Sequence, residues 1–210
     1  MPDDKSEKKT LKEILSFLPT LVNDIKKADE KLEVKETLDD EQYFRRTYVR
    51  TFLPMLEGIV YGTKMALFGI TCSPNFKNIN KLNDPDVFIL RGLTYDLKRN
   101  GQVHEIQKYF NIEDDLKFTV KSFNRVLGAN INLGVGTSEG WDNFIKTKKI
   151  RNSIVHPKNS TDLNISNEDW ERIRSASSWF YDIFAEMLLA LQDFSKNQKC
   201  SVDLKRRDDE

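Results

Sequence analysis

Residues 141–157 read WDNFIKTKKIRNSIVHP, and the fold prediction starts from this stretch. It predicts a helix that begins at Trp141. The final proline disfavours the helical conformation of the residue before it, so the helix is expected to end at His156. Arg151, Asn152 and His156 are thereby gathered within six residues at the end of one helix, in a chain that contains only two histidines.

The sequence before this stretch predicts two long helices. Residues 11–32 carry hydrophobic residues at helical spacing, and Pro19 is expected to kink or divide that helix. Thr37 is followed by acidic residues, the pattern of a helix N-cap. The second helix is expected to run from there to about Thr71, with a bend at Pro54.

Between the long helices and residue 141, the sequence predicts loops, a hairpin and a short helix. Residues 72–86 are rich in Asn, Pro and Asp, which predicts a loop. Asn100-Gly101 lies between stretches of alternating polarity, which predicts a small β-hairpin over about 93–106. A continuing helix is the alternative there. A short amphipathic helix should end at Gly128, and a glycine-rich loop should follow it.

A last long helix is predicted after a second loop. Ser166 and Asp169 have the spacing of an N-cap and its partner. The helix is expected to bury one stripe of side chains. The stripe consists of Trp170, Ile173, Ala176, Ser177, Phe180, Phe184, Met187 and Leu191.

Together these segments predict an all-α protein, an antiparallel helical bundle with a small β-hairpin insertion. The expected organisation is a flexible segment over 1–9, a single helical domain over 10–196 and a polar tail over 197–210.

Composition narrows the function classes. The 210 residues hold 33 Lys and Arg and 33 Asp and Glu, so the chain lacks the basic excess of a DNA-coating protein. Two cysteines are too few for a disulfide framework or a zinc site.

The most hydrophobic stretch of the chain includes Glu57 and Lys64, which favours a core helix over a membrane span. The N-terminus is charged where a signal peptide is hydrophobic. We therefore expect a cytoplasmic protein with no membrane contact, no metal and no cofactor.

The end of the helix at His156 carries residues suited to phosphodiester chemistry. Asn152 and His156 are four residues apart and share a helical face, whereas Arg151 lies off that face. Cleavage of RNA by its own 2′-hydroxyl needs a base, an acid and a cation that stabilises the phosphorane. Histidine titrates near neutrality and serves as base or acid, and arginine matches phosphate oxygens with paired hydrogen bonds. The alternative is that His156 only caps the helix end.

The motif RNSIVH, between one helix and a capped long helix, resembles the signature of the HEPN superfamily (higher eukaryotes and prokaryotes nucleotide-binding domains). That signature is an Arg, a polar residue, three to five further residues and a His. Arg151, Asn152 and His156 fill these positions in the shortest spacing. The resemblance covers roughly residues 141–191, and the hairpin is an addition to the basic four-helix fold of the family.

The resemblance implies a metal-independent endoribonuclease that leaves a 2′,3′-cyclic phosphate, in a toxin–antitoxin or phage-defence (abortive-infection) setting. Arg151 and His156 would be catalytic, and Asn152 would orient them or contact phosphate. Members of the family use the Arg and His of two chains in one cleft, which predicts a homodimer acting on RNA. The alternative is a non-catalytic module that binds a nucleotide or a partner protein, such as a nucleotidyltransferase or an antitoxin.

The dimer also addresses the shortage of histidines. His104 lies on the predicted hairpin and is expected to be a surface residue, so a second His156 would have to come from the twin subunit. If that second imidazole is too distant, Lys149 or Lys158 could assist electrostatically.

The second long helix carries further candidates. Tyr43, Arg50, Glu57 and Lys64 recur at seven-residue intervals, with Tyr61 on an adjacent turn. Arg50, Glu57 and Tyr61 are possible contributors to a cleft formed with Arg151 and His156. The alternative is an internal ladder of ion pairs or a solvated face.

Overall fold

The computed structural model describes residues 4–34, 37–72 and 82–208, and burial within these ranges is described for Ser16 and residues 18–196. Most of the predicted loop at 72–86 lies outside the described residues. Its last part is a short helix that the sequence analysis missed. Asn83 caps this helix, and its side chain accepts a hydrogen bond from the backbone N–H of Asp86 at 2.9 Å.

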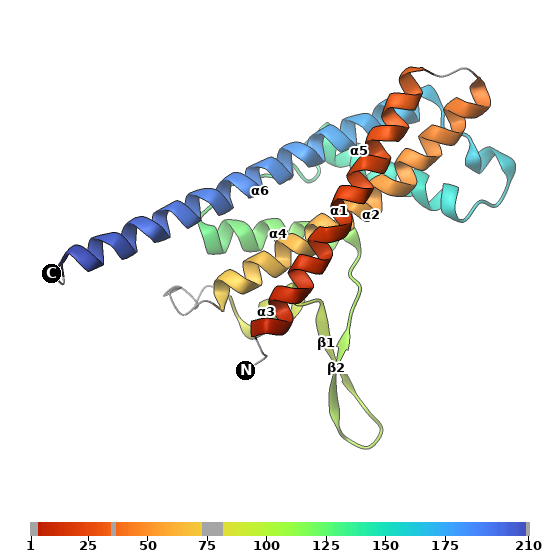
Figure 1. Cartoon of the computed structure of the whole chain (residues 1–210). Coiled ribbons are helices and arrows are strands. Elements are labelled where there is room, and N and C mark those ends of the chain that lie inside the picture. Colours follow the sequence, from red (N-terminus) through yellow and green to blue (C-terminus); the bar gives the residue numbers. More distant parts are fainter. Residues whose placement is uncertain (1–3, 35–36, 73–81, 209–210) are drawn as a thin grey trace.

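The chain is mostly helical, with one two-stranded antiparallel sheet, so the prediction of an all-α fold with a β-hairpin is confirmed (Figure 1). In chain order the elements are α1 (Asp4–Glu33), α2 (Leu38–Thr71), α3 (Asp84–Leu90), β1 (Leu93–Leu97), β2 (Val103–Gln107), α4 (Ile112–Leu127), α5 (Glu139–Val155), the short 3-10 helix η2 (Ser160–Leu163) and α6 (Asn167–Asp208).

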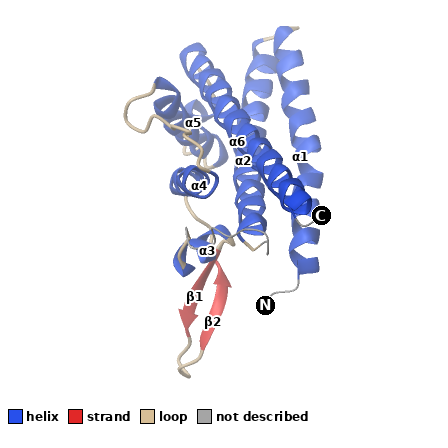
Figure 2. Ribbon diagram, turned by 90° about the vertical axis from the view of Figure 1, so that its left-hand side faces the viewer, coloured by secondary structure: helices blue, strands red, loops and turns tan. Residues whose placement is uncertain are grey.

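Helix α2 lies at the centre of the molecule and packs against α1, α4 and α5 (Figures 1 and 2). It begins as predicted, because the Thr37 hydroxyl accepts a hydrogen bond from the backbone N–H of Asp40 at 3.1 Å. Pro54 is accommodated within it. Helix α1 is likewise continuous through Pro19, so the proline does not divide it, and α1 extends beyond the predicted 11–32 at both ends.

The hydrophobic core joins α2 to α4, α5 and α6. Trp141 and Phe144 of α5 pack against Trp179 of α6, with ring centroids 5.9 and 5.7 Å from it. A side chain at Gly140 would place its Cβ 2.4 Å from the Trp179 ring, so the glycine allows the two helices to approach. These contacts fix the direction in which α5 runs and therefore the position of its C-terminal end.

Helix α6 begins at the predicted cap, where the Ser166 hydroxyl accepts a hydrogen bond from the backbone N–H of Asp169 at 3.1 Å. It continues to Asp208, through the segment expected to be a polar tail. Six residues of the predicted stripe are buried, while Phe184 and Leu191 are partly buried against the core.

The hairpin forms where Asn100-Gly101 predicted it, with Asp96 opposite His104, and it extends one residue past the expected range to Gln107. It projects away from the helices (Figure 2). The N–H of Lys108 donates to the carbonyl of Gly92 at 2.9 Å and closes the base of the hairpin. His104 is exposed, as the sequence predicted for a surface residue.

Within the described residues, no helix is both long and hydrophobic enough to cross a bilayer.

Candidate functional site

The C-terminal end of α5 presents His156 to solvent. The backbone N–H of His156 donates to the carbonyl of Asn152 at 2.9 Å, and its φ and ψ of −126° and 61° lie outside the helical region. The helix therefore stops directly before Pro157, as the sequence predicted. The imidazole is exposed, and it forms no hydrogen bond or ion pair with any part of the chain that the structure describes.

Lys149 and Asn152 lie on the same exposed face of α5 as His156. They precede His156 by seven and four residues, which places all three along one side of the helix. Within the described ranges the side chains of Lys149 and His156 form no hydrogen bond or ion pair, so both remain available to a ligand. This face therefore offers a cation, an amide and an imidazole to solvent.

Arg151 points to a different side of α5. Five residues at about 100° each put its direction roughly 140° from that of His156, with Asn152 between them. Arg151 Nη1 donates to Asn152 Oδ1 at 3.2 Å, and no hydrogen bond joins Arg151 to His156 among the described residues. Arg151 is half-buried and its Nε atom is fully buried without a hydrogen-bond partner in the described structure. Within the same ranges the guanidinium forms no ion pair, so its charge remains available to an anion.

Two of the predicted α2 residues adjoin this end of α5. Arg50 Nη2 donates to the carbonyl of Ile154 at 3.2 Å, which places a positive charge at the negative end of the α5 dipole. Glu57 lies near Arg151. Partial burial raises the pKa of the Glu57 carboxyl above its ordinary value, and the charge of Arg151 offsets part of that rise.

Tyr61, the third α2 candidate, lies one turn further along and lines a separate pocket, which Glu57 also borders. Burial raises the pKa of its hydroxyl, and the nearby Tyr109 adds to the rise. The α2 stripe thus spans two neighbouring sites, with Glu57 between them.

The connection after His156 is held by other residues of α2. Arg46 donates to the carbonyl of Leu163 at 3.0 Å, and Arg45 donates to that of Ile165 at 2.8 Å. Lys158 uses its backbone N–H to donate to the Asp162 carboxylate at 2.7 Å, and its side chain is exposed. The described contacts of Arg45 and Arg46 position the chain rather than hold a ligand, and Lys158 lies near His156 in sequence with its ammonium group in solvent.

Lys148 is a further neighbour of the site, in the basic run KTKKIR that ends at Arg151. It precedes Arg151 by one turn of α5, and its ammonium group contacts the Glu113 carboxylate and Asn111 Oδ1, the latter at 3.2 Å. This contact ties the Arg151 side of α5 to the start of α4.

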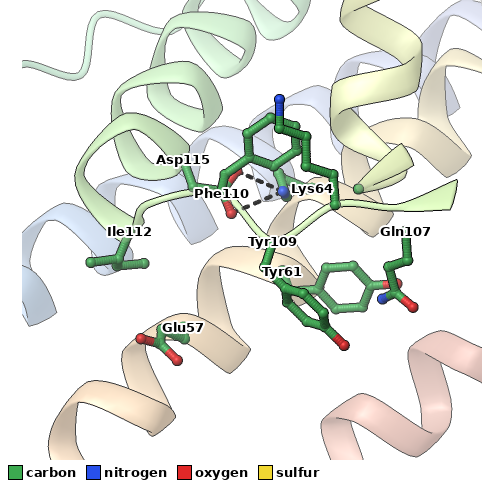
Figure 3. A pocket seen from close by; sticks show the side chains of 10 residues that line it. Glu57, Tyr61, Lys64, Gln107, Tyr109, Phe110, Ile112 and Asp115 are labelled. Atoms are coloured by element: carbon green, nitrogen blue, oxygen red, sulfur yellow. Dashed lines mark hydrogen bonds and ion pairs between the residues drawn. The ribbon is translucent and has the colours of Figure 1, made fainter. Parts of the chain in front are cut away.

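The sequence analysis missed the pocket beside Glu57 (Figure 3). Its volume is about 240 Å³. The buried Lys64 donates to both carboxylate oxygens of Asp115 at 2.6 and 2.9 Å. The Lys64 ammonium also lies 5.9 Å from the ring centre of Tyr61 and 5.5 Å from that of Phe110. The helical spacing placed Lys64 on the stripe, but no local pattern indicates a partner that is 51 residues away.

Within the described residues, no group of three or more His, Cys, Asp or Glu side chains is placed to hold a metal ion. No protein-family model, no curated protein and no solved structure matches the chain.

Proposed function

We propose that the protein is a metal-independent endoribonuclease whose active site is built on the C-terminal end of α5. The observation that carries the proposal is an exposed imidazole at His156, one turn after Asn152. The Asn152 side chain accepts a hydrogen bond from Arg151, whose guanidinium has no ion-pair partner in the described structure. The resemblance of RNSIVH to the HEPN signature supports the same assignment.

In the proposed reaction His156 accepts the proton of a ribose 2′-hydroxyl. The 2′-oxygen then attacks phosphorus, and the bond from phosphorus to the 5′-oxygen breaks. Arg151 donates hydrogen bonds to the phosphoryl oxygens, whose negative charge grows in the transition state. Asn152 accepts a hydrogen bond from Arg151 and lies on the same face of α5 as His156. Protonation of the leaving 5′-oxygen completes the reaction, which yields a 2′,3′-cyclic phosphate and a 5′-hydroxyl.

The acid of this reaction is the missing part, because no second imidazole lies on this end of α5. We assign the role to His156 of a second copy, in a homodimer whose two α5 ends share one RNA phosphate. Lys149 lies on the His156 face and Lys158 follows in the next loop. Both would attract the RNA backbone, and binding should weaken as salt is added.

Purified protein incubated with mixed single-stranded RNA in EDTA tests the proposal. We expect wild type to produce fragments ending in 2′,3′-cyclic phosphate, and His156→Ala and Arg151→Ala to be at least about a hundred-fold slower, the usual scale of general acid–base and electrostatic contributions. His104→Ala is the matched control, since it removes the other exposed histidine and should cleave like wild type. An inactive wild type, or equal rates for His156→Ala and wild type, would rule the proposal out.

A second candidate is a non-catalytic module that binds a nucleotide or a partner protein such as an antitoxin or nucleotidyltransferase. The divergence of Arg151 and His156 on α5 favours this candidate, because their side chains do not meet in a single chain. Growth on expression distinguishes the two. Toxicity that His156→Ala abolishes supports the nuclease, and harmless expression of an abundant, folded wild type supports the binding module.

A further inference from the structure

The pocket between α2, the base of the hairpin and the start of α4 has the composition of a site for a single base. Aromatic side chains of Tyr61, Tyr109 and Phe110 line it (Figure 3). Its volume of about 240 Å³ is below the roughly 300–1,000 Å³ of pockets for drug-sized ligands, so it suits a ligand of fragment size.

Tyr109 is unusual because 87% of its surface is exposed although it borders a pocket. It lies two residues after the end of β2, next to Lys108, whose hydrogen bond to Gly92 fixes this segment to the base of the hairpin. An exposed aromatic ring beside a cavity is a surface on which an unpaired base can stack, and such stacking contributes about 1–3 kcal/mol per base.

The charges of the pocket define which edge of a base it can accept. Lys64 and Asp115 neutralise each other at the back. Glu57 is the remaining carboxylate, and it forms no hydrogen bond or ion pair with any described residue. An ionised carboxylate only accepts hydrogen bonds, and its two oxygens match two adjacent donors. Guanine presents such a pair, N1–H and the N2 amino group, whereas the corresponding edges of adenine, cytosine and uracil mix donors with acceptors.

We propose that this pocket binds a guanine base, with Glu57 accepting from its N1–H and N2 amino group and Tyr109 stacking on its face. The proposal deepens the proposed ribonuclease function and rests on it for the identity of the substrate. Glu57 borders the pocket and also lies near Arg151, so the pocket and the end of α5 are neighbouring sites, and an RNA strand held by a guanine in the pocket would continue toward the guanidinium. Lys108, also on the rim, is placed to contact that nucleotide's phosphate. The enzyme would therefore cut RNA next to guanosine.

Binding of mononucleotides, followed by NMR titration, tests the pocket without requiring cleavage. We expect GMP to bind wild type at least ten-fold more tightly than AMP, CMP or UMP, and IMP, which lacks the N2 amino group, to fall between them. Glu57→Gln should abolish the preference for GMP because its amide offers only one acceptor. Tyr109→Ala should weaken GMP binding at least five-fold, and its exposed position leaves the fold intact.

Glu186→Gln on α6 is the matched control, because it makes the same change at an exposed site away from the pocket and should leave GMP binding unchanged. Three results would overturn the proposal. They are equal affinity for all four nucleotides, no detectable binding at about 10 mM GMP, and a preference for GMP that survives Glu57→Gln.

Mapping of cleavage sites separates this inference from the proposed function. RNA cleaved without regard to guanosine would reject the guanine pocket and leave the ribonuclease standing. Guanine-specific binding in a protein that cleaves no RNA would support the pocket and reject the ribonuclease.

Discussion

Asn152 separates the two side chains on which the proposed chemistry rests. The sequence alone indicated that Arg151 lies off the face shared by Asn152 and His156, because helical geometry fixes those directions. It did not indicate what Arg151 faces instead. Glu57 of α2 takes that position, and the partial burial that raises the pKa of its carboxyl comes from packing between helices that are distant in sequence.

The raised pKa of Glu57 has a functional consequence at the residue scale. The proposed guanine contact requires an ionised carboxylate, so we expect GMP affinity to be full at neutral pH and to fall as pH drops through a value above the ordinary glutamate pKa of 4.5. NMR titrations with GMP, repeated at pH values from about 4 to about 8, measure the effect. A GMP affinity that stays constant to the acid end of this interval would contradict the role of Glu57.

Tyr48, a single residue, provides a prediction about how the stability of the fold depends on pH. Burial raises the pKa of its hydroxyl to about 12, and the hydroxyl donates to Ser177 Oγ at 2.8 Å. The unfolded chain loses this proton near pH 10, whereas the folded chain keeps it to about 12. The free energy of unfolding should therefore be unaffected below pH 10 and fall by about 2–3 kcal/mol by pH 12 because of this group.

Urea unfolding of wild type and Tyr48→Phe, measured at neutral and alkaline pH, isolates the contribution of Tyr48. The variant should be less stable than wild type at neutral pH, since it lacks the bond to Ser177, and this difference should shrink at alkaline pH. A difference that stays constant across the alkaline range would show that Tyr48 titrates alike in both states.

At the scale of elements, the polar residues of α2 serve different neighbours rather than one cleft. Arg45 and Arg46 hold the connection before α6, Arg50 contacts the end of α5, and Lys64 pairs with Asp115 of α4. The seven-residue spacing predicted a shared stripe. Lys64 forms an ion pair with Asp115 of α4, but Arg50 and Glu57 form no ion pair with any described residue, so the stripe does not form a ladder of ion pairs in the described structure. The spacing could not assign partners, because these depend on how α4, α5 and α6 pack around α2.

The Lys64–Asp115 pair should be a strong link between α2 and α4. The Lys64 side chain is 2% exposed and that of Asp115 is 15% exposed. Replacing Lys64 with Met leaves a carboxylate enclosed without its partner, so we expect a loss of about 3–5 kcal/mol in the free energy of unfolding. The double variant with Asp115→Leu should recover much of that loss, because no unpaired charge remains.

Lys98→Met provides the matched control in a urea unfolding series. Lys98 contacts Asp96 at 2.7 Å on the hairpin, but both side chains are about half exposed, so the same substitution should cost less than about 1 kcal/mol. Additive effects of the Lys64 and Asp115 substitutions would mean that the pair does not act as one unit.

Elements were predicted more completely than the site. Caps at Thr37 and Ser166, the Asn100-Gly101 turn and the stop at Pro157 act over a few residues, so the sequence reveals them directly. The pocket combines the base of the hairpin with α2 and α4, and no short pattern brings these together.

For the whole molecule, the proposed reaction sets a requirement that one chain does not meet. The sequence contains two histidines, and His104 lies on the projecting hairpin (Figure 2). A base and an acid at one phosphate therefore require His156 from two copies, with their α5 ends facing each other across a two-fold axis. The proposed activity should then belong to the dimer and fall on dilution below its dissociation constant.

Co-expression of differently tagged wild-type and His156→Ala chains tests this requirement. If each dimer has one site that uses both imidazoles, only dimers of two wild-type chains are active. An equal mixture at constant total concentration then retains about a quarter of the wild-type rate, because random pairing leaves that share of dimers intact. Isolated mixed dimers should be inactive. Mixing with His104→Ala should leave the rate unchanged.

A rate of about one half in the first mixture, or an active mixed dimer, would show that each chain works with its own His156. The acid would then have to lie within the same chain, and Lys149 and Lys158 would be the first residues to substitute.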